Sequence, residues 1–286
     1  MSGKKTILVD KEPLILLSKF NFVNNCCVEN IDLAFAYECS FDIRVNNILT
    51  ARGIRIIGGD RFNKILQSVI LERHGVPHPT TYYNKTTFNT FSYIEEYDSY
   101  IDMPGEYVTK PSMGARGICV DIMDRSKYKS IIEGNASVIR KHINESWKPQ
   151  LDISDGYARG VYEKKDLIVQ QLIKIKKEFR VIIFAHGDYC AYERVKSEGQ
   201  FLGNLSSGAS PKQLSIEDCD IINPVIDKML IIIRELSYPW LSVDVYVDED
   251  GEPGVIEFQM EFAYEGFSPS TIKDHMYKSL LYYMKS

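Results

Sequence analysis

The sequence predicts an α+β protein, and two observations support that class. The first is a pair of strand-like segments, LSVDVYV and GVIEFQ, joined by DEDGEPG, because an Asp-Gly pair between alternating apolar residues is a strong hairpin signal. The second is that helical patterns occur singly, as in residues 216–236 and in the last segment, where Ile272, Met276 and Leu280 share one face. Hairpins mixed with single helices are typical of α+β architectures and not of one doubly wound sheet.

Composition narrows the class of protein. The chain has 286 residues, 44% of them hydrophobic, which is enough apolar content for a substantial core. Its formal net charge of −5 and its lack of basic blocks argue against nucleic acid as a partner. It has no run of about 18 apolar residues, so no contact with a membrane is expected. The six cysteines form no CxxC pair and no Cys/His cluster, which predicts a cytoplasmic protein with reduced thiols and neither a disulfide framework nor a zinc site.

The N-terminal residues are expected to form a small α/β unit. The segments KTILVD, 31–37 and IRIIGG are typical of short buried strands in a parallel sheet, with a helix over residues 45–52. A second helix is predicted over residues 61–74. Its apolar residues at helical spacing are Phe62, Ile65, Leu66, Val69 and Ile70.

Two further units are expected along the chain. The first of them would contain strands TTYYN, EYVTKP, ICVDIM and DLIVQQLI, with helices over residues 88–97 and 128–142. The other would contain strands KEFRVIIF and YCAYERV, a loop rich in glycine and serine, the helix over 216–236 and the hairpin described above. Apolar runs of this length, separated by turn residues, are the usual strand signal.

A candidate metal site lies on the C-terminal hairpin. Positions i and i+2 of a strand face the same side, so Glu257 and Gln259 present two side-chain oxygens together. The Asp-Gly turn folds the preceding strand back and can bring Asp244 near them. Two carboxylates and an amide oxygen, without thiol or imidazole, are hard ligands suited to magnesium held against phosphates. The alternative is a solvated polar face of a hairpin.

A glycine loop leaves a predicted strand at Lys110, in the segment KPSMGARG. Glycines allow backbone N–H groups to converge on an anion, and the lysine adds positive charge. The spacing matches neither the P-loop nor the dinucleotide-binding fingerprint. An anion-binding loop and an ordinary tight hairpin therefore both stay open.

Two other features suggest nucleotide or anion binding. The strand VQQLI runs toward Glu178, an arrangement that can supply backbone groups to a base and a carboxylate to a ribose, although a plain buried strand is the alternative. Arg180 and Arg194 lie on successive predicted strands, and Asn204 follows in the Gly/Ser loop. Arginines that project into one pocket offer planar donors for carboxylate or phosphate oxygens, whereas surface arginines are the default alternative.

Taken in order over residues 54–267, these features resemble the ATP-grasp ligase superfamily. The order is a lysine in the linking helix, a lysine before a glycine loop, a hinge strand, an arginine strand, a loop asparagine and then Asp…Glu-x-Gln. Within the superfamily, the segments GIR, NK and GVP, and later ERVKSEGQFLGNLSSGAS, are most similar to RimK-type glutamate ligases and LysX-type amino-acid-carrier ligases. The resemblance implies an ATP-grasp fold of three units, residues 1–78, 79–173 and 174–286, with ATP clamped between the sheets of the last two.

The resemblance also implies a role for each residue that matches the family pattern. The residues that would bind the ATP phosphates, directly or as part of a lid loop over them, are Lys64, Lys110, Met113, Gly114 and Gly117. The residues that would bind adenine at the hinge or the ribose are Gln170, the Gln171 carbonyl, the Ile173 N–H and Glu178. The residues that would hold two magnesium ions, or Mn²⁺ in their place, are Asp244, Glu257 and Gln259. The residues that would face the reacting groups are Arg180, Arg194 and Asn204.

The activity implied by the resemblance is ADP-forming ligation. A carboxylate becomes an acyl phosphate, and an amine then displaces phosphate and forms an amide. The partners would be ATP, a carboxylate donor and an amine acceptor that is a peptide, a protein tail or an amino-acid-like metabolite, and homo-oligomers are common in the family. A non-catalytic ATP-binding protein with a regulatory or assembly role is the alternative from another class, and a phosphotransferase is a third hypothesis.

The sequence also departs from the family pattern. Gln259 stands where the family commonly has asparagine in Glu-x-Asn, and a glutamine stands where the hinge commonly has glutamate. Leu202 stands where RimK-type enzymes have an arginine, and Ser206 and Ser207 replace their His-Arg pair. Loss of these cationic positions weakens the case for a glutamate substrate.

Overall fold

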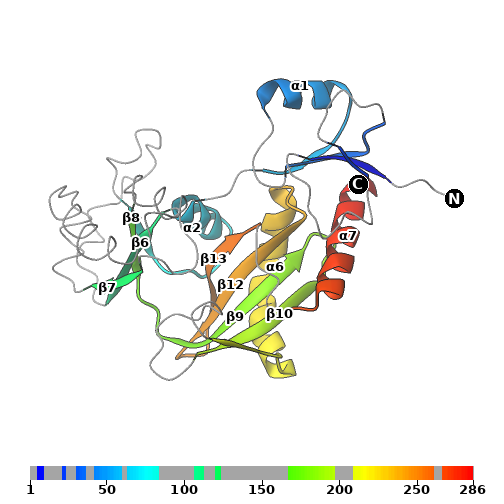
Figure 1. Cartoon of the computed structure of the whole chain (residues 1–286). Coiled ribbons are helices and arrows are strands. Elements are labelled where there is room, and N and C mark those ends of the chain that lie inside the picture. The colour runs from blue at the N-terminus through cyan, green and yellow to red at the C-terminus, as the bar shows by residue number, and fades with distance from the viewer. Residues whose placement is uncertain are drawn as a thin grey trace, which may run out of the picture. The chain divides into compact units, whose positions relative to one another are not determined.

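The structure is a computed structural model in which the chain forms two compact units (Figure 1). The residues that it describes are 5–9, 21–23, 30–36, 42–59, 63–83, 106–112, 120–123, 167–196, 209–260 and 266–285. One unit comprises Met1–Phe62, Arg73–Pro77 and Ile175–Ser286, and the other comprises Asn63–Glu72 and His78–Lys174. The helices predicted over residues 88–97 and 128–142 lie outside the described residues. The three-unit division of the chain stays a prediction.

A small parallel sheet forms the start of the first unit. Its strand order is β2-β1-β3-β4, and each neighbouring pair is parallel. The strands are β1 (Thr6–Val9), β2 (Asn21–Val23), β3 (Leu33–Ala36) and β4 (Ile56–Gly58). Helix α1 (Ile43–Ala51) packs on this sheet, because Leu49 joins Leu8 and Ala34 in one buried cluster. The parallel sheet expected from the short apolar segments is thereby confirmed.

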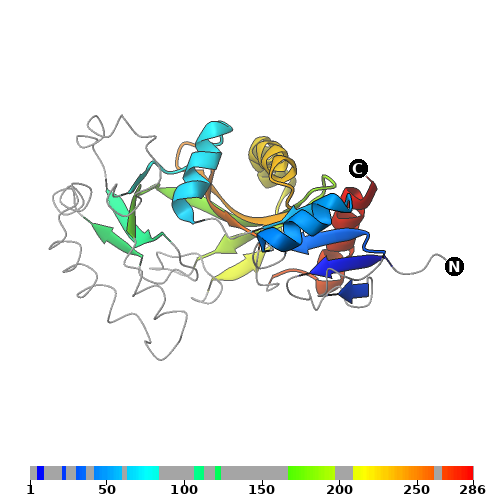
Figure 2. The same ribbon diagram turned by 90° about the horizontal axis from the view of Figure 1, so that it is seen from above.

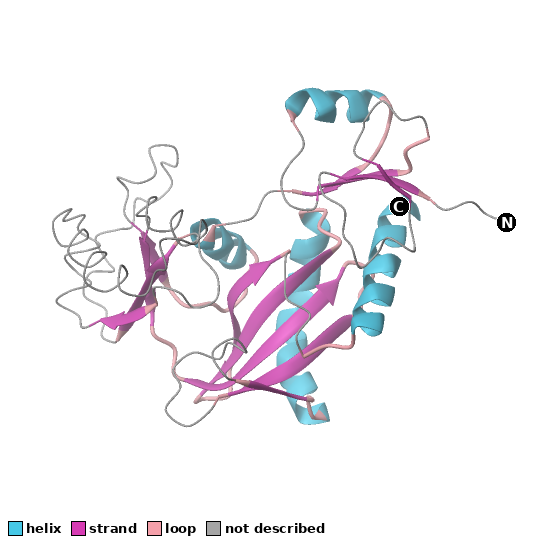
Figure 3. Cartoon of the chain, in the orientation of Figure 1, coloured by secondary structure: helices cyan, strands magenta, loops and turns pink. Residues whose placement is uncertain are grey.

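A five-stranded antiparallel sheet follows in the same unit (Figure 3). Its strand order is β11-β10-β9-β12-β13. The strands are β9 (Ile175–Phe184), β10 (Tyr189–Val195), β11 (Ser210–Lys212), β12 (Trp240–Asp248) and β13 (Pro253–Gln259). The predicted hairpin between β12 and β13 is confirmed, since Val247 pairs with Pro253 and Gly251 in the turn has φ of 91°. Glycine adopts this backbone conformation without a steric cost.

The two faces of the five-stranded sheet differ in chemistry because side chains alternate along each strand. On one face, Phe179 and Val181 are buried next to helix α6 (Ile216–Glu235), which lies behind the strands in Figure 1. Lys177 has the same parity on β9 and forms a hydrogen bond with Asp218 of α6. The view from above also shows α6 along one side of the strands (Figure 2). One core layer therefore lies between α6 and this face. The opposite face carries Arg180 and Asp244 and, toward the end of β9, the buried apolar residues Ile182, Phe184 and Trp240.

Helix α7 (Pro269–Lys285) lies beside the turn between β9 and β10. Ile272, Met276 and Leu280 are all buried, which confirms the apolar face expected from their spacing. Near the end of the helix, the Tyr283 hydroxyl donates to the Tyr238 carbonyl at 3.0 Å. Neither α7 nor any other helix among the described residues combines the length and the apolarity that crossing a bilayer requires.

The second unit contains a four-stranded antiparallel sheet. Its order is β5-β8-β6-β7. The strands are β5 (Thr81–Tyr83), β6 (Tyr107–Pro111), β7 (Asp121–Met123) and β8 (Leu167–Gln171). Helix α2 (Lys64–Arg73) is joined to this sheet at two points. The Lys64 N–H donates to the Ser112 carbonyl at 2.9 Å, and the Ser68 hydroxyl donates to the Thr81 hydroxyl at 2.8 Å.

The structure differs from the sequence prediction in three elements. The strands β2 and β11 are not expected from the sequence, because each has only three residues, Asn-Phe-Val and Ser-Pro-Lys, which are too few to show a strand period. In α2, Leu66 and Val69 are exposed although they contribute to the predicted apolar spacing, whereas Gln67 and Ser68 are buried. Ser68 can be buried because its one hydroxyl hydrogen has two acceptors within reach, the Thr81 hydroxyl and the Lys64 carbonyl of the preceding turn, and a satisfied hydroxyl loses little on burial.

Two adjacent isoleucines test the buried face of α6. Ile232 is 0% exposed and Ile231 is 54% exposed. We expect Ile232→Ala to lower the free energy of unfolding by about 2–5 kcal/mol, because it leaves a cavity in the core. Ile231→Ala is the matched control and should change it by less than about 0.5 kcal/mol. Urea unfolding followed by circular dichroism measures both, and equal losses would contradict the packing described for α6.

Candidate active site

A row of polar residues crosses the face of the five-stranded sheet opposite α6. The register places Tyr192 opposite Arg180, Arg180 opposite Asp244, and Asp244 opposite Glu257. Four neighbouring strands, β10, β9, β12 and β13, therefore each contribute one residue. Directly opposite side chains in such a sheet have Cβ atoms about 5 Å apart, so groups that are distant in the sequence meet on this face. The expected approach of Asp244 to Glu257 is confirmed by this register.

Asp244 lies between two arginines. Its Oδ1 is 2.7 Å from Arg180 Nε and 3.1 Å from Arg194 Nη2. Its Oδ2 accepts hydrogen bonds from Arg180 Nη2 at 3.2 Å and from Arg194 Nη1 at 3.1 Å. Arg180 Nη1 also donates to the Ser242 hydroxyl at 2.7 Å. Because a guanidinium group held at several atoms has a fixed orientation, both arginines are positioned before any substrate arrives.

Glu178 extends this network on the other side of Arg194. Arg194 Nη1 donates to Glu178 Oε1 at 2.6 Å, and Lys196 Nζ is 3.2 Å from Glu178 Oε2. The side chains of Arg194 and Glu178 are only 4% and 7% exposed. The alternative that Arg194 is an ordinary surface arginine is therefore wrong. Arg194 is a buried cation between two buried carboxylates.

Burial and charge act on these groups in opposite directions. Burial raises the pKa of Asp244 above its ordinary value; Arg180 and Arg194 oppose the rise, while Glu257 and Glu178 add to it. Burial alone would lower the pKa of Arg194, but attraction to Asp244 and Glu178 raises it overall. Arg194 is thus held in its charged form, whereas a negative charge on Asp244 is stable only with cations beside it.

The C-terminal hairpin fits a hard divalent cation. Asp244 and Glu257 are register neighbours, and Gln259 is opposite Ser242 on the same face. Asp244 Oδ1 is buried, and no donor in the described part of the chain has the geometry of a hydrogen bond to it. Its ion pairs with Arg180 and Arg194 therefore leave this oxygen without a directed hydrogen bond, and carboxylate and amide oxygens are the ligands that magnesium takes. The residues present therefore fit magnesium, and the assignment of Asp244, Glu257 and Gln259 as its ligands stays a proposal.

The two lysines predicted to bind phosphates both lie in the second unit, at neighbouring segments. Lys64 is the first residue of α2, and its backbone N–H donates to the Ser112 carbonyl. Ser112 directly follows β6, the strand that contains Lys110. Lys64 is 9% exposed and Lys110 is 7% exposed. Lysine is almost never buried to this extent unless it has a specific partner. Their burial distinguishes both residues from solvated surface lysines.

The predicted hinge residues lie at the end of β8. Gln170 is buried, and its Nε2 donates to the Thr81 hydroxyl at 2.6 Å. The Gln171 N–H donates to the Thr80 carbonyl at 3.0 Å. Ile173 follows in the short connection to β9 and is half-buried. The Gln170 side chain therefore braces β5 against β8, and a role in adenine binding is left to the backbone around Gln171 and Ile173 as a prediction.

Several predicted residues lie outside the part of the chain that the structure describes. These are Met113, Gly114, Gly117 and Asn204. Conversely, the structure adds two residues to the network that sequence reasoning missed. Ser242 lies two positions before Asp244 on β12. Lys196 lies two positions after Arg194, directly after the end of β10. The period of two along a strand is a signal that could have found both.

The family of the protein follows from its sequence and agrees with this fold. The sequence matches the family model of the RimK-like ATP-grasp domain over residues 62–222. This match covers more than half of the chain, so the protein belongs to the RimK-like ATP-grasp family. Ligase chemistry with bound nucleotide and magnesium is the activity of ATP-grasp ligases. No protein of curated function matches the sequence.

Solved structures of ATP-grasp ligases are similar to this protein in fold. D-alanine–D-alanine ligase from Bacillus anthracis, complexed with ATP, is 15% identical with a TM-score of 0.54, and the match covers 99% of both chains. A Chryseobacterium gregarium RiPP-associated ATP-grasp ligase, in complex with ADP and a leader and core peptide, is 12% identical with a TM-score of 0.57, covering 98% of this chain and 97% of that one. The ATP-grasp ligase PsnB, complexed with precursor peptide PsnA2 and AMPPNP, is 11% identical with a TM-score of 0.53 and complete coverage of both chains, 100% each. These similarities confirm the α+β, ATP-grasp fold.

Arg194 offers a test of the buried charge network. We expect Arg194→Met to lower the free energy of unfolding by about 3–5 kcal/mol, because it leaves two buried carboxylates without their shared partner. Lys212→Met is the matched control. Lys212 Nζ is 2.8 Å from Glu193, but its side chain is 62% exposed, so the loss should stay below about 1 kcal/mol. Chemical denaturation measures both, and equally small losses would show that the buried network does not stabilise the sheet.

Proposed function

We propose that the protein is an ADP-forming ligase that joins a carboxylate to an amine. The observation that supports this most strongly is the network of charged residues on the face of the sheet opposite α6. There Asp244 lies opposite Glu257 and contacts both Arg180 and Arg194. Membership in the RimK-like ATP-grasp family supplies the class of chemistry. The residue roles given below are part of the proposal.

The proposed reaction has two steps that both concentrate negative charge. A carboxylate oxygen of the substrate attacks the γ-phosphorus of ATP, the bond to the β-phosphate oxygen breaks, and an acyl phosphate and ADP result. The amine then attacks the acyl carbon, and inorganic phosphate leaves. Such steps need oriented cations and donors and no nucleophilic side chain. Arg180 and Arg194 are suited to this task because their planar groups are already held in place by Asp244.

The magnesium site of the proposal consists of Asp244, Glu257 and Gln259. Bound magnesium would neutralise phosphate oxygens during the transfer of the phosphoryl group. The side chains of Glu257 and Gln259 are half-buried, and Phe258 between them is buried on the other face. The two oxygen donors of β13 are therefore presented together. Gln259 keeps the amide oxygen of the family's asparagine on a side chain that is one methylene longer.

The nucleotide contacts of the proposal come from buried groups. Lys64 and Lys110 would bind phosphate oxygens, and burial strengthens that attraction because the local dielectric is low. Glu178 would bind the ribose. Its two oxygens already contact Arg194 and Lys196, but each carboxylate oxygen has a second lone pair that can accept a ribose hydroxyl. The Gln171 carbonyl and the Ile173 N–H would bind adenine.

The substrate class has two candidates. Two of the similar structures contain a leader or precursor peptide, which supports a peptide or a protein tail. The similar D-alanine–D-alanine ligase supports an amino-acid-like metabolite. A test of the proposal should therefore present carboxylates of both kinds.

The experiment that tests the proposed function is ADP release with magnesium and a panel of peptide and amino-acid carboxylates, with hydroxylamine as a surrogate amine. Hydroxylamine traps an acyl phosphate as a hydroxamate. We expect hydroxamate and ADP in equal amounts, both dependent on the carboxylate. Tight ATP binding without turnover of any carboxylate would instead favour the non-catalytic ATP-binding alternative, and ADP release with a stable phosphorylated product would favour a phosphotransferase.

Glu257→Ala tests the assignment of the magnesium ligands. We expect turnover to fall by roughly 100-fold or more, because the charge that develops in phosphoryl transfer loses part of its stabilisation. Glu249→Ala is the control, since Glu249 is exposed in the turn of the same hairpin. Both variants should give the circular dichroism spectrum of the unchanged protein. An unaltered rate for Glu257→Ala would defeat the assignment.

A further inference from the structure

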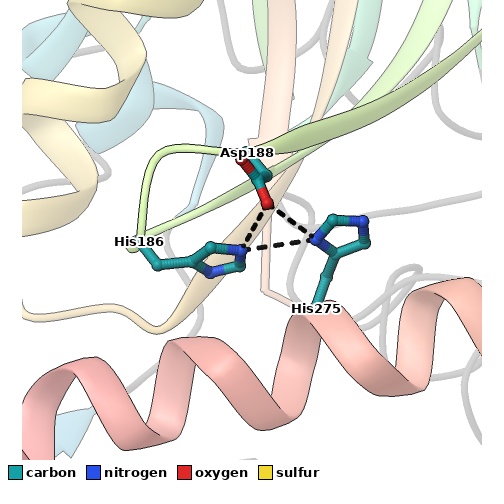
Figure 4. A group of neighbouring side chains, drawn as sticks. All are labelled: His186, Asp188 and His275. Carbon is teal, nitrogen blue, oxygen red and sulfur yellow. Dashed lines mark hydrogen bonds and ion pairs between the residues drawn. The ribbon is translucent and has the colours of Figure 1, made fainter.

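A second group of ligand-type side chains lies at the turn between β9 and β10, four residues of strand beyond Arg180 and so about 13 Å or more from the charged row. His186 and Asp188 belong to this turn, and His275 comes from α7 (Figure 4). His186 Nε2 is 3.1 Å from Asp188 Oδ2 and 3.3 Å from His275 Nδ1, and His275 Nδ1 is 3.4 Å from Asp188 Oδ2. The three atoms form a nearly equilateral triangle, and the roles proposed above use none of them.

The size of this triangle matches one face of a tetrahedral metal site. Bonds from zinc to imidazole nitrogen and carboxylate oxygen are about 2.0–2.2 Å long, so two ligand atoms of a regular tetrahedron are about 3.3–3.6 Å apart. The distances in the cluster, 3.1, 3.3 and 3.4 Å, lie within about 0.2 Å of this range. These distances leave room for one cation at bonding distance from all three atoms. The His186 and His275 rings are nearly parallel, at 13° with centroids 5.5 Å apart, so each ring must tilt for both nitrogen lone pairs to face the cation.

Protons satisfy this cluster less well than a metal ion. Within the cluster itself, the only hydrogens are those on the ring nitrogens, and each nitrogen carries at most one; Lys278 and solvent can donate only to Asp188, which is exposed. If both nitrogens donate to Asp188, two N–H groups face each other across 3.3 Å. If only one nitrogen carries a proton, that proton is directed at one neighbour or divided between two in a weaker bifurcated hydrogen bond. One divalent cation accepts lone pairs from all three atoms at once.

The surroundings hold both rings in position. His186 Nδ1 is 2.8 Å from the hydroxyl of Ser279, which is buried, so Nε2 is turned toward the cluster. A hydrogen bond at the other ring nitrogen is a usual feature of metal-ligating histidine. The His275 ring stacks on Phe184, with centroids 5.0 Å apart. Asp188 is exposed, so an ion can enter from solvent and a water molecule can complete the coordination.

We propose that His186, Asp188 and His275 bind a divalent transition metal, with zinc as the favoured ion, and that the bound metal ties α7 to the turn between β9 and β10. Two imidazoles and one carboxylate suit zinc, whereas magnesium takes oxygen ligands, as in the hairpin site proposed above. Lys278 Nζ is 3.8 Å from Asp188 Oδ2, but its side chain is exposed and can turn away. The sequence predicts no zinc site because it has no CxxC pair and no Cys/His cluster, and His275 is 89 positions from His186.

Metal titration of the full chain, made metal-free and without a histidine tag, tests this proposal. CoCl₂ is added while visible absorption is recorded, and ZnCl₂ is added in a calorimeter. We expect one equivalent of each metal to bind, intense absorption bands of tetrahedral cobalt, and displacement of cobalt by zinc. Saturating zinc should raise Tm by roughly 5 °C, because it binds only the folded chain. None of these measurements depends on ligase activity.

Variants of the cluster separate metal binding from a simple ion pair. We expect His275→Ala and Asp188→Ala to weaken zinc binding by more than about 100-fold, and Ser279→Ala by about 10-fold, as is usual when a partner behind a ligand is lost. His78→Ala, which removes a histidine of the second unit, should bind zinc like the unchanged protein. Asp188 is exposed, so its variant keeps the fold even if a histidine variant does not. Absence of zinc binding by the unchanged protein, or equal binding by Asp188→Ala, would overturn the proposal.

Discussion

The contact between Asp244 and two arginines is the constraint on which the active-site face depends. A carboxylate in the middle of a sheet and next to a hydrophobic core is costly unless cations compensate it. Arg180 is its direct neighbour on β9, and Arg194 reaches it from β10, one strand further. The strand order β10-β9-β12 is what allows this.

Helix α6 on the other side of the sheet offsets the cost of these buried charges. The apolar residues that alternate with them along the same strands are buried against α6 and stabilise the fold. Phe179 and Val181 alternate with Glu178 and Arg180 along β9. The first pair packs under α6, and the second pair takes part in the charge network. One strand thus contributes to stability and to the candidate chemistry at the same time, and a shift of one residue in its register would exchange the two.

Two kinds of donor are segregated on this one sheet. Oxygen donors gather on β12 and β13, where the proposed ligands Asp244, Glu257 and Gln259 share a face. Imidazole donors gather at the turn after β9 and on α7. Because hard cations select oxygen and borderline cations select nitrogen, the two proposed sites need not compete for one ion. The first belongs to the proposed reaction with ATP, and the second belongs to the attachment of α7.

Local pattern determined a large part of this protein. The period of two along the strands predicts that Glu257 and Gln259 share a face, and the Asp-Gly turn predicts that Asp244 lies beside them, as the register confirms. Both predictions concern residues close in sequence, for which the backbone geometry of a strand or a tight turn allows few arrangements. The order of motifs along the chain predicts the ATP-grasp fold, which the family match and the similar structures confirm.

Three features were decided only by the tertiary structure. Arg194 binds both Glu178 and Asp244. Helix α2 buries Gln67 and Ser68 in place of Leu66 and Val69. His275 of α7 contacts His186. The reason is that periodicity says which residues share a face of one element, whereas contacts over 50 or 89 positions depend on which elements become neighbours.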